Sequence, residues 1–357
     1  MKGGLETVEL RLEVLTPLHV GVSREGELVR GLDYYVRGRE IHVVDPMTLD
    51  PERAREAAEA LREGDYKRAE RAIEGAEVLH RVELRTGEPP DRYLPTYRPT
   101  RDDDPWVPGT SVKGVLRTGL LLAALKRLHE LGLNLETLTD RLPRGNRASE
   151  ALDRRLRVTV FQGGTAPRSS HGWPNVHPHA DVLRAVKVSD ARPVEVTTAV
   201  LRAELHPEGR HLDAREFVVT GAFELELGVD ETELRNVLRT WSEVGMPRLP
   251  RPVYEFLSAV QRELREFWEE TLEGPESLLE RAREGWKEGL RALGEAFNVD
   301  VPGDADAQLG WGGGRLTKTV VPLLGRVLPA GGMGDLRPRT VRLVDGEVPG
   351  LVRVELA

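Results

Sequence analysis

The sequence contains no cysteine, which excludes disulfide bonds, cysteine nucleophiles and thiolate zinc sites. It also has no apolar run near the roughly 18 residues that a membrane-spanning helix needs, and no apolar stretch of the secretory-signal type at its start. These absences predict a cytoplasmic protein that does not contact a membrane. Only seven of the 51 basic residues are Lys. A chain so rich in Arg and Glu is typical of proteins that contain networks of ion pairs.

What is present is typical of a soluble, globular protein. The chain has 357 residues, of which 39% are hydrophobic and 31% charged, and this length predicts two domains. The net charge of −8 disfavours binding to nucleic acid overall, but the charge is uneven. Residues 255–300 carry twelve acidic and six basic side chains, whereas residues 308–357 carry four acidic and seven basic ones. A nucleic-acid partner would therefore have to bind a local basic surface, with the acidic helices facing elsewhere.

Apolar periodicity predicts an α+β fold. Residues that alternate between apolar and polar predict strands, and residues at helical spacing predict helices. The strands are predicted at 8–14, 32–36, 41–44, 158–164, 183–194, 197–205, 217–227, 316–324 and 351–357. The helices are predicted at 51–79 with a break at Gly64, from 109 to about 131, in parts of 135–156, at 231–244, and at 253–297 with a break at 274–275. The strands fall into small antiparallel groups with helices between them, not into regular βαβ units.

The stretch VPGTSVKGVLRTGLL, which begins at Val107, is the first candidate site. It lacks the spacing of a nucleoside-triphosphate loop. Thr110 or Ser111 is placed to cap the helix, and Gly109 lets the backbone approach a ligand. Lys113 and Arg117 are four residues apart, so they share one face near the positive end of the helix. The pattern fits either a phosphate site or a capped core helix with two exposed cations.

Three further stretches contain candidate residues. LGWGGGRLTKT holds three consecutive glycines, Gly312 to Gly314, beside Arg315 and Lys318, and it is either a phosphate-binding loop or a plain turn. In TPLHVG, His19 is a candidate acid, base or RNA contact, although a lone histidine is more often structural. His171, His177, His179 and Asp181 contain metal-ligand types but lack a recognised metal spacing, which favours incidental histidines. We therefore predict no metal, no cofactor and no catalytic residue.

These stretches together resemble the RAMP superfamily of CRISPR effector subunits. The resemblance rests on LTPLHVG, on VPGTSVKGVLR, which meets every position of the family's helix-start pattern, and on LGWGGGRLTKT. Within this family the chain resembles the type III-A (Csm) subunit that caps the 3′ end of crRNA. LRAVKVSDARPV and the ending RPRTVRLVDGEVPGLVRVEL indicate this, although Leu351 stands where the family usually has Trp.

The resemblance implies two ferredoxin-like (RRM-like) modules with helical insertions, which we place at residues 1–190 and 191–357. It implies a non-catalytic subunit that binds the 3′ part of crRNA, caps the backbone filament and supports crRNA maturation. The implied partners are crRNA, the other type III-A subunits, above all the backbone subunit, and a recruited maturation nuclease.

The implied RNA contacts are Gly109, Ser111, Lys113, Arg117, His19, Gly312, Gly313, Gly314, Arg315 and Lys318. Bases are expected to stack on Trp106 or Trp311.

Two alternatives remain open. One is a RAMP-family endoribonuclease that uses His19 or the histidine cluster. The other is a different RAMP subunit, either the backbone protein or a Cmr-type equivalent. Asp33 is the nearest match to the backbone subunit's cleaving aspartate, and its place in the predicted strand 32–36 indicates a structural role.

Overall fold

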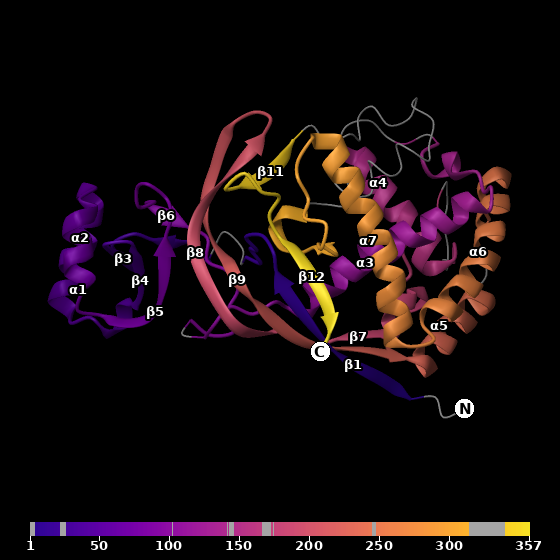
Figure 1. The fold of residues 1–357 in the computed structure, drawn as a ribbon, viewed down its shortest axis with the longest axis horizontal. Helices are drawn as coiled ribbons and strands as arrows, with labels where there is room; N and C mark the ends of the chain where they lie inside the picture. Colours follow the sequence, from indigo (N-terminus) through magenta and orange to yellow (C-terminus); the bar gives the residue numbers. More distant parts are fainter. Residues whose placement is uncertain are drawn as a thin grey trace.

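The fold is seen in a computed structural model, which describes residues 4–21, 26–101, 103–140, 142, 146–165, 173, 175–244, 248–313 and 340–357. Gly314, Arg315 and Lys318 lie outside these residues, as do His171 and the predicted strand 316–324. Within them the protein is α+β, as predicted, with a large sheet and helices gathered at its two ends (Figure 1).

A ten-stranded sheet forms the centre of the molecule. Its main path has the order β10-β12-β1-β9-β8-β5-β4-β3, while β7 pairs with β9 and β11 pairs with β8. All of these ladders are antiparallel except the one between β5 and β8. The strands are β1 (Leu5–Val14), β3 (Tyr34–Arg37), β4 (Glu40–Asp45), β5 (Glu77–Leu84), β7 (Val186–Val188), β8 (Arg192–His206), β9 (Arg210–Asp230), β10 (Ala307–Gln308), β11 (Val341–Val344) and β12 (Leu351–Leu356). β2 (Leu28–Val29) and β6 (Arg92–Tyr93) form a small second sheet.

Strand β1 shows why the sheet has one apolar and one charged face. Leu10, Leu12 and Val14 are buried, whereas Glu9 is exposed and Arg11 is half-buried. Because successive side chains of a strand point to opposite faces, the alternation buries one face of the sheet against the helices and leaves the other in solvent. The predicted strand 8–14 is confirmed.

Five helices cover the apolar face at one end of the sheet (Figure 1). They are α3 (Gly109–Glu130), α4 (Asn146–Leu156), α5 (Glu231–Val244), α6 (Arg251–Thr271) and α7 (Pro275–Phe297). Their apolar side chains and those of β1, β9 and β12 form the largest core cluster, which includes Trp241 and Trp268. The predicted helices at 109–131, 231–244 and 253–297, with its break before Pro275, are confirmed. None of the helices among the described residues is sufficiently long and apolar to span a bilayer.

A smaller lobe lies at the other end of the sheet, where α1 (Pro51–Glu63) and α2 (Tyr66–Ile73) pack beside β3 and β4 (Figure 1). Gly64 ends α1 in the left-handed region with φ of 76°, as the predicted break at this residue requires. The prediction of helix as far as residue 79 is wrong, because β5 begins at Glu77. The alternating sequence of β5 lets it pair with β4 and β8, and this pairing overrides the helical composition before it.

The predicted strand at 158–164 is also wrong. Residues Arg157–Phe161 form a π-helical turn that continues α4, and Val158, Thr159, Val160 and Phe161 are all buried. The turn is surrounded on all sides by the helical layer, which explains why its residues are apolar. The pattern of such a run does not distinguish a buried helical turn from a buried strand. Of the predicted strand 183–194, only β7 and the start of β8 are extended.

The two predicted domains share the sheet. β1, from the first half of the chain, lies between β12 and β9 from the second half, and β5 pairs with β8 across the same division. The division into modules at residues 1–190 and 191–357 stays a prediction.

Close contact between α3 and α7 depends on two glycines. A Cβ atom at Gly285 would lie 1.9 Å from the carbonyl oxygen of Gly119, and one at Gly119 would lie 2.5 Å from that of Ala282. Each glycine thus leaves the space that the backbone of the other helix fills. Trp286 adds a hydrogen bond across this contact, from its Nε1 to the carbonyl oxygen of Val115 at 2.8 Å.

We expect Gly285→Ala to lower the free energy of unfolding by about 2 kcal/mol or more, because the helices must separate to admit a methyl group. Gly114→Ala is the control. It lies on α3, where a Cβ would meet nothing within 4 Å, so it should raise stability by up to about 1 kcal/mol through helix propensity. Urea unfolding measures both, and equal effects of the two variants would contradict the packing argument.

Candidate nucleic-acid interface

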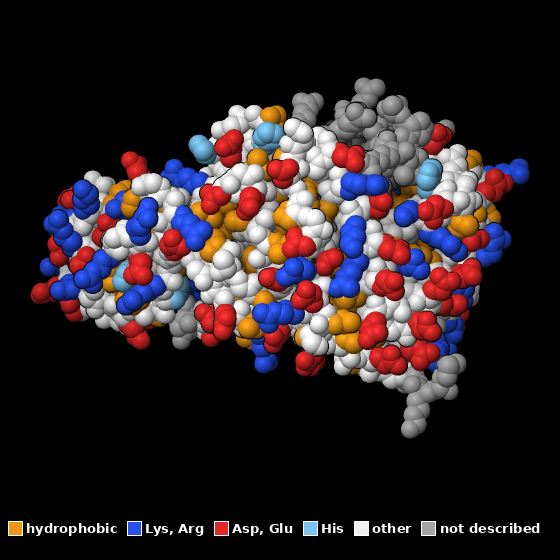
Figure 2. Space-filling model, in the orientation of Figure 1, with side chains coloured by type: hydrophobic (Ala, Val, Ile, Leu, Met, Phe, Trp, Pro, Cys, Tyr) orange, Lys and Arg blue, Asp and Glu red, His pale blue; other side chains and the backbone are white. Residues whose placement is uncertain are grey.

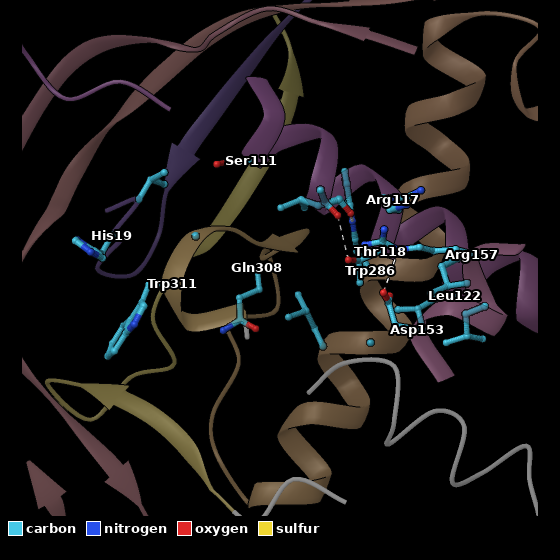
Figure 3. Close-up of a pocket in the computed structure, with 18 of the residues that line it drawn as sticks. His19, Ser111, Arg117, Thr118, Leu122, Asp153, Arg157, Trp286, Gln308 and Trp311 are labelled. Carbon is cyan, nitrogen blue, oxygen red and sulfur yellow. Dashed lines mark hydrogen bonds and ion pairs between the residues drawn. The ribbon is translucent and has the colours of Figure 1, made fainter. Parts of the chain in front are cut away.

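Three stretches that lie far apart in the sequence meet around one cleft of about 540 Å³ (Figure 3). His19 and Gly21 follow β1, Ser111 to Thr118 belong to the first turns of α3, and Gly310 and Trp311 begin the glycine-rich stretch. The cleft is therefore the place where the three motifs singled out in the sequence come together.

The start of α3 is fixed from within the protein. Pro108 is the N-cap and no side chain caps the helix, so the prediction of a cap by Thr110 or Ser111 is wrong. Instead the Gly109 N–H donates to Asp190 Oδ1 at 2.7 Å. A Cβ at Gly109 would lie 2.6 Å from the backbone carbonyl oxygens of Val188 and Ser189 at the end of β7. The group that approaches Gly109 closely is thus the protein's own backbone, and the anion near its N–H is the Asp190 carboxylate. Ser111 lines the cleft.

Lys113 and Arg117 lie on one side of α3, as their spacing predicts, and both are held by internal partners. Lys113 Nζ donates to the Val186 carbonyl oxygen at 2.8 Å. Arg117 pairs with Asp181 at 2.6 Å, and its guanidinium carbon lies 4.8 Å from the centre of the Phe161 ring. Burial lowers the pKa of each group, because it disfavours the charged form. Arg117 borders the cleft, whereas Lys113 is directed toward β7.

His19 is buried, with 2% of its surface exposed. Its Nδ1 lies 2.7 Å from the Glu216 carbonyl oxygen, and an Arg215 N–H donates to its Nε2 at 3.1 Å. Nδ1 therefore carries the proton and the ring is neutral. Burial, with a smaller contribution from the Arg215 charge, lowers the pKa of His19 to about 4. The ring leaves no nitrogen for a ligand, and its observed action is to orient Arg215.

A buried ion pair supports this histidine. Arg98 binds the Glu216 carboxylate through two hydrogen bonds of 2.8 and 2.5 Å, and the Thr96 N–H donates to the same carboxylate. Burial opposes both charges, yet their attraction prevails, so the pKa of Glu216 lies below its ordinary value and that of Arg98 above. The backbone that carries Glu216 is thereby fixed under His19.

Two arginines that the sequence did not single out stack on Trp311. The guanidinium carbons of Arg215 and Arg342 lie 4.1 and 4.2 Å from the centre of its larger ring system, and Arg342 also donates to the Trp311 carbonyl oxygen at 2.7 Å. The Trp311 N–H donates to the His19 carbonyl oxygen at 2.8 Å, which ties the glycine-rich stretch to the loop after β1. No local pattern marks Arg215, because it lies almost 200 positions from His19.

The glycine-rich stretch begins with a 3₁₀ turn, Gly310–Gly313, so that Gly312 and Gly313 lie next to Trp311. Gly310 has φ of 77°, and a Cβ there would lie 2.4 Å from the His19 carbonyl oxygen. Glycine at this position is required by backbone contact as well as by conformation.

Charge distinguishes the cleft from the rest of the surface. Among the residues that the structure describes, its lining contains Arg117, Arg157 and Arg215 and one carboxylate, that of Asp153. The solvent face of the sheet is acidic by contrast and holds Glu9, Glu13, Glu224, Glu226 and Glu355 with Arg11 and Arg353. Acidic side chains also gather at the lower end of the helical layer (Figure 2). A polyanion would therefore be attracted to the cleft and repelled by these surfaces.

The remaining candidates are held by local contacts. Asp181 is paired with Arg117, and His179 Nδ1 lies 2.7 Å from an Arg184 nitrogen. Across the part of the chain that the structure describes, no three His, Asp or Glu side chains converge as a metal site would require. Asp33 lies in a turn before β3, where its Oδ2 accepts a hydrogen bond from the Val29 N–H at 2.9 Å. Strand β3 begins one residue after Asp33.

The buried histidine predicts a pH dependence of stability. Its folded pKa of about 4 lies below the ordinary value of 6.5, so the unfolded chain binds a proton first as the pH falls. Stability is unaffected above pH 6.5 and should fall by about 3 kcal/mol as the pH drops from 6.5 to 4. Urea unfolding across this range should show a flatter profile for His19→Gln. The exposed His211→Gln should keep the wild-type slope, and a wild-type slope in His19→Gln would refute the assignment.

Comparison with known proteins places the fold in a family. The family model of the RAMP superfamily matches residues 11–317. The chain is similar to a chain of the Csm–crRNA–target RNA ternary complex of a type III-A CRISPR–Cas system, with 22% identity and a TM-score of 0.67 over 98% of this chain and 100% of that one. It is also similar to T. onnurineus Csm5, with 22% identity and a TM-score of 0.55 over 96% and 99%. No curated protein matches. Because the family model covers most of the sequence, this chain belongs to the RAMP superfamily.

Proposed function

We propose that the protein is a non-catalytic RNA-binding subunit of a type III-A CRISPR effector complex. In this role it binds the 3′ part of crRNA in the cleft, caps the backbone filament and supports crRNA maturation. One observation carries the proposal: the three stretches that resemble family motifs meet at a cleft lined by three arginines and one carboxylate, in a chain of net charge −8. Similarity over nearly the full length to Csm5 and to a chain of a Csm–crRNA complex supports the same role.

RNA phosphates are the ligands of the cleft arginines in this proposal. Arg157 and Arg215 line the cleft and are both half-buried, so part of each residue remains accessible to a ligand. Trp311 offers a flat surface beside Arg215 for an RNA base. Such contacts depend on charge and shape, not on base sequence.

The RNA contacts implied by the family resemblance remain proposals, and the residues differ in where they lie relative to the cleft. Arg117 and Ser111 line the cleft, and Gly312 and Gly313 follow Trp311 in the 3₁₀ turn beside it. Gly314, outside the described residues, is proposed as a contact from its place in the sequence. Lys113, Gly109 and His19 already bind within the protein, so we assign them to shaping the site, His19 through Arg215. Arg315 and Lys318 follow the glycines in the sequence and are proposed as additional phosphate contacts.

Gly114 supports the choice of this surface. It is exposed on α3 and lines the cleft, and a Cβ there would meet nothing within 4 Å. Glycine inside a helix costs about 1 kcal/mol relative to alanine. Neither conformation nor internal packing requires it at this position, so close approach of a ligand to the helix backbone is the remaining physical reason.

The acidic surfaces are left for protein partners. Glu266, Glu269, Glu273, Glu276 and Glu280 are exposed around the junction of α6 and α7, where RNA would be repelled. We propose that neighbouring type III-A subunits, including the backbone subunit, and a recruited nuclease bind outside the cleft. We also propose that the sheet and its helices derive from two ferredoxin-like modules. The neutral, fully hydrogen-bonded His19 supports a role without chemistry.

Replacing Arg157 and Arg215 together by Ala should weaken binding of a single-stranded RNA of about 12 nucleotides. Each lost phosphate contact lowers the slope of log K against log salt by about 0.7, so the double variant should lose about 1.4. Fluorescence anisotropy of labelled RNA over a salt series measures both the affinity and the slope.

The matched control is the double variant Arg154→Ala with Arg210→Ala. It removes the same charge from β9 and from α4, which leads directly into the turn that holds Arg157, at exposed positions away from the cleft. Its RNA affinity and salt slope should stay close to wild type. Equal losses in the two double variants would show that net charge, and not the cleft, governs binding.

A further inference from the structure

The cleft has a second half whose walls, apart from Arg157, the phosphate contacts do not use. We call it the helical half and define it by Thr118 and Leu122 of α3, Asp153 and Leu156 at the end of α4, Arg157 of the following π-helical turn, and Leu290 of α7. In Figure 3 the labelled Thr118, Leu122, Asp153 and Arg157 lie together, apart from His19 and Trp311 at the other half, with Gln308 between the two.

The walls of the helical half are mostly apolar. Leu122, Leu156 and Leu290 line it with side chains that are almost completely buried, and Trp286 contributes its ring. An apolar cleft with a few polar groups is the usual form of a site that binds a flat organic group. A hydrated phosphate would gain nothing from these walls, whereas a nucleobase would bury its ring against them.

The polar group in this half is a carboxylate. Asp153 Oδ2 pairs with Arg157 at 3.0 Å, while its buried Oδ1 accepts no hydrogen bond from the described residues. A carboxylate repels phosphate and accepts hydrogen bonds from N–H donors. It therefore selects a ligand that is apolar on its faces and carries an amino group at its edge. The single edge N–H of uracil lies between two carbonyl oxygens, which a carboxylate repels.

We propose that the helical half accepts one unstacked nucleobase that carries an exocyclic amino group, which is cytosine, adenine or guanine in preference to uracil. The amino group donates to Asp153 Oδ1, and the phosphates on either side of this nucleotide lie at Arg157 and Arg215. This inference rests on the proposed function, because it requires that RNA enter the cleft.

A nucleobase is favoured over other occupants by continuity and charge. The helical half opens directly into the half that Arg215 and Trp311 line, so an RNA strand bound there would pass its mouth. Arg117 and Arg157 at the rim match the charge of the strand on either side of an inserted base.

The test compares two oligonucleotides and two matched variants. Oligocytidylate and oligouridylate of about 12 nucleotides have similar size and charge. At the base edge cytosine presents an amino group, whereas uracil presents an N–H between two carbonyl oxygens. Thr118→Phe fills the helical half without changing charge. Thr240→Phe is its control, because Thr240 is also a half-buried helical threonine whose hydroxyl donates to the carbonyl oxygen four residues earlier, but on α5 away from the cleft. Asp153→Asn keeps the shape of the acceptor and removes its charge.

For the wild-type full-length chain and for Thr240→Phe, anisotropy should show oligocytidylate binding about tenfold more tightly than oligouridylate, as a charged hydrogen bond allows. In Thr118→Phe and in Asp153→Asn the ratio should fall to about one, with oligouridylate still bound by the cleft arginines. The ratio, and not the absolute affinity, is the measured quantity, since Asp153→Asn also makes the cleft more positive.

A wild-type ratio of one, or an unchanged ratio in Thr118→Phe, overturns the base site and leaves the proposed function standing if the arginine variants still weaken binding. Absence of RNA binding by the wild type overturns both proposals. If Thr118→Phe leaves both RNA affinities unchanged but prevents co-purification with the backbone subunit, the occupant is a protein side chain and the base site is refuted.

Discussion

The cleft depends on the buried ion pair between Arg98 and Glu216. Removing two charges from water is costly, and it is offset here only because the guanidinium and the carboxylate meet through two hydrogen bonds. The same residue, Glu216, accepts the His19 hydrogen bond through its carbonyl oxygen. His19 in turn orients Arg215, which stacks on Trp311. A chain of contacts that begins at a largely buried ion pair thus sets the position of the cation that faces the cleft.

The arrangement separates two surfaces of opposite character. The solvent face of the sheet is dominated by Glu side chains, with Arg11 and Arg353 paired to some of them. An RNA platform on a sheet face uses exposed aromatic side chains, and this face presents none among its strands β1, β9 and β12. In the proposed function RNA binds in the cleft beside α3 and proteins bind the acidic exterior. This division would reconcile the net charge of −8 with a role in an RNA-binding complex.

Strong periodicity made most elements predictable. The alternation in residues 8–14 predicts a strand and the apolar spacing at 231–244 predicts a helix, and the structure contains both. The pattern of residues 158–164 is ambiguous, because a short buried apolar run fits a strand or a helical turn equally well. Strand β5 was hidden by the helical composition before it and became a strand through its pairing with β4 and β8. Pairing and burial decided these segments.

The sequence by itself determined the family, because the motif that begins at Val107 and the glycines near Gly312 need particular residues in particular order. It also determined that Lys113 and Arg117 share a face of one helix, since helix geometry fixes that spacing. Only the tertiary structure decided which groups these two side chains bind, since an amine or guanidinium binds the nearest partner that packing supplies. Packing supplied a carbonyl oxygen and Asp181, and brought Arg215 to the cleft from a distant strand.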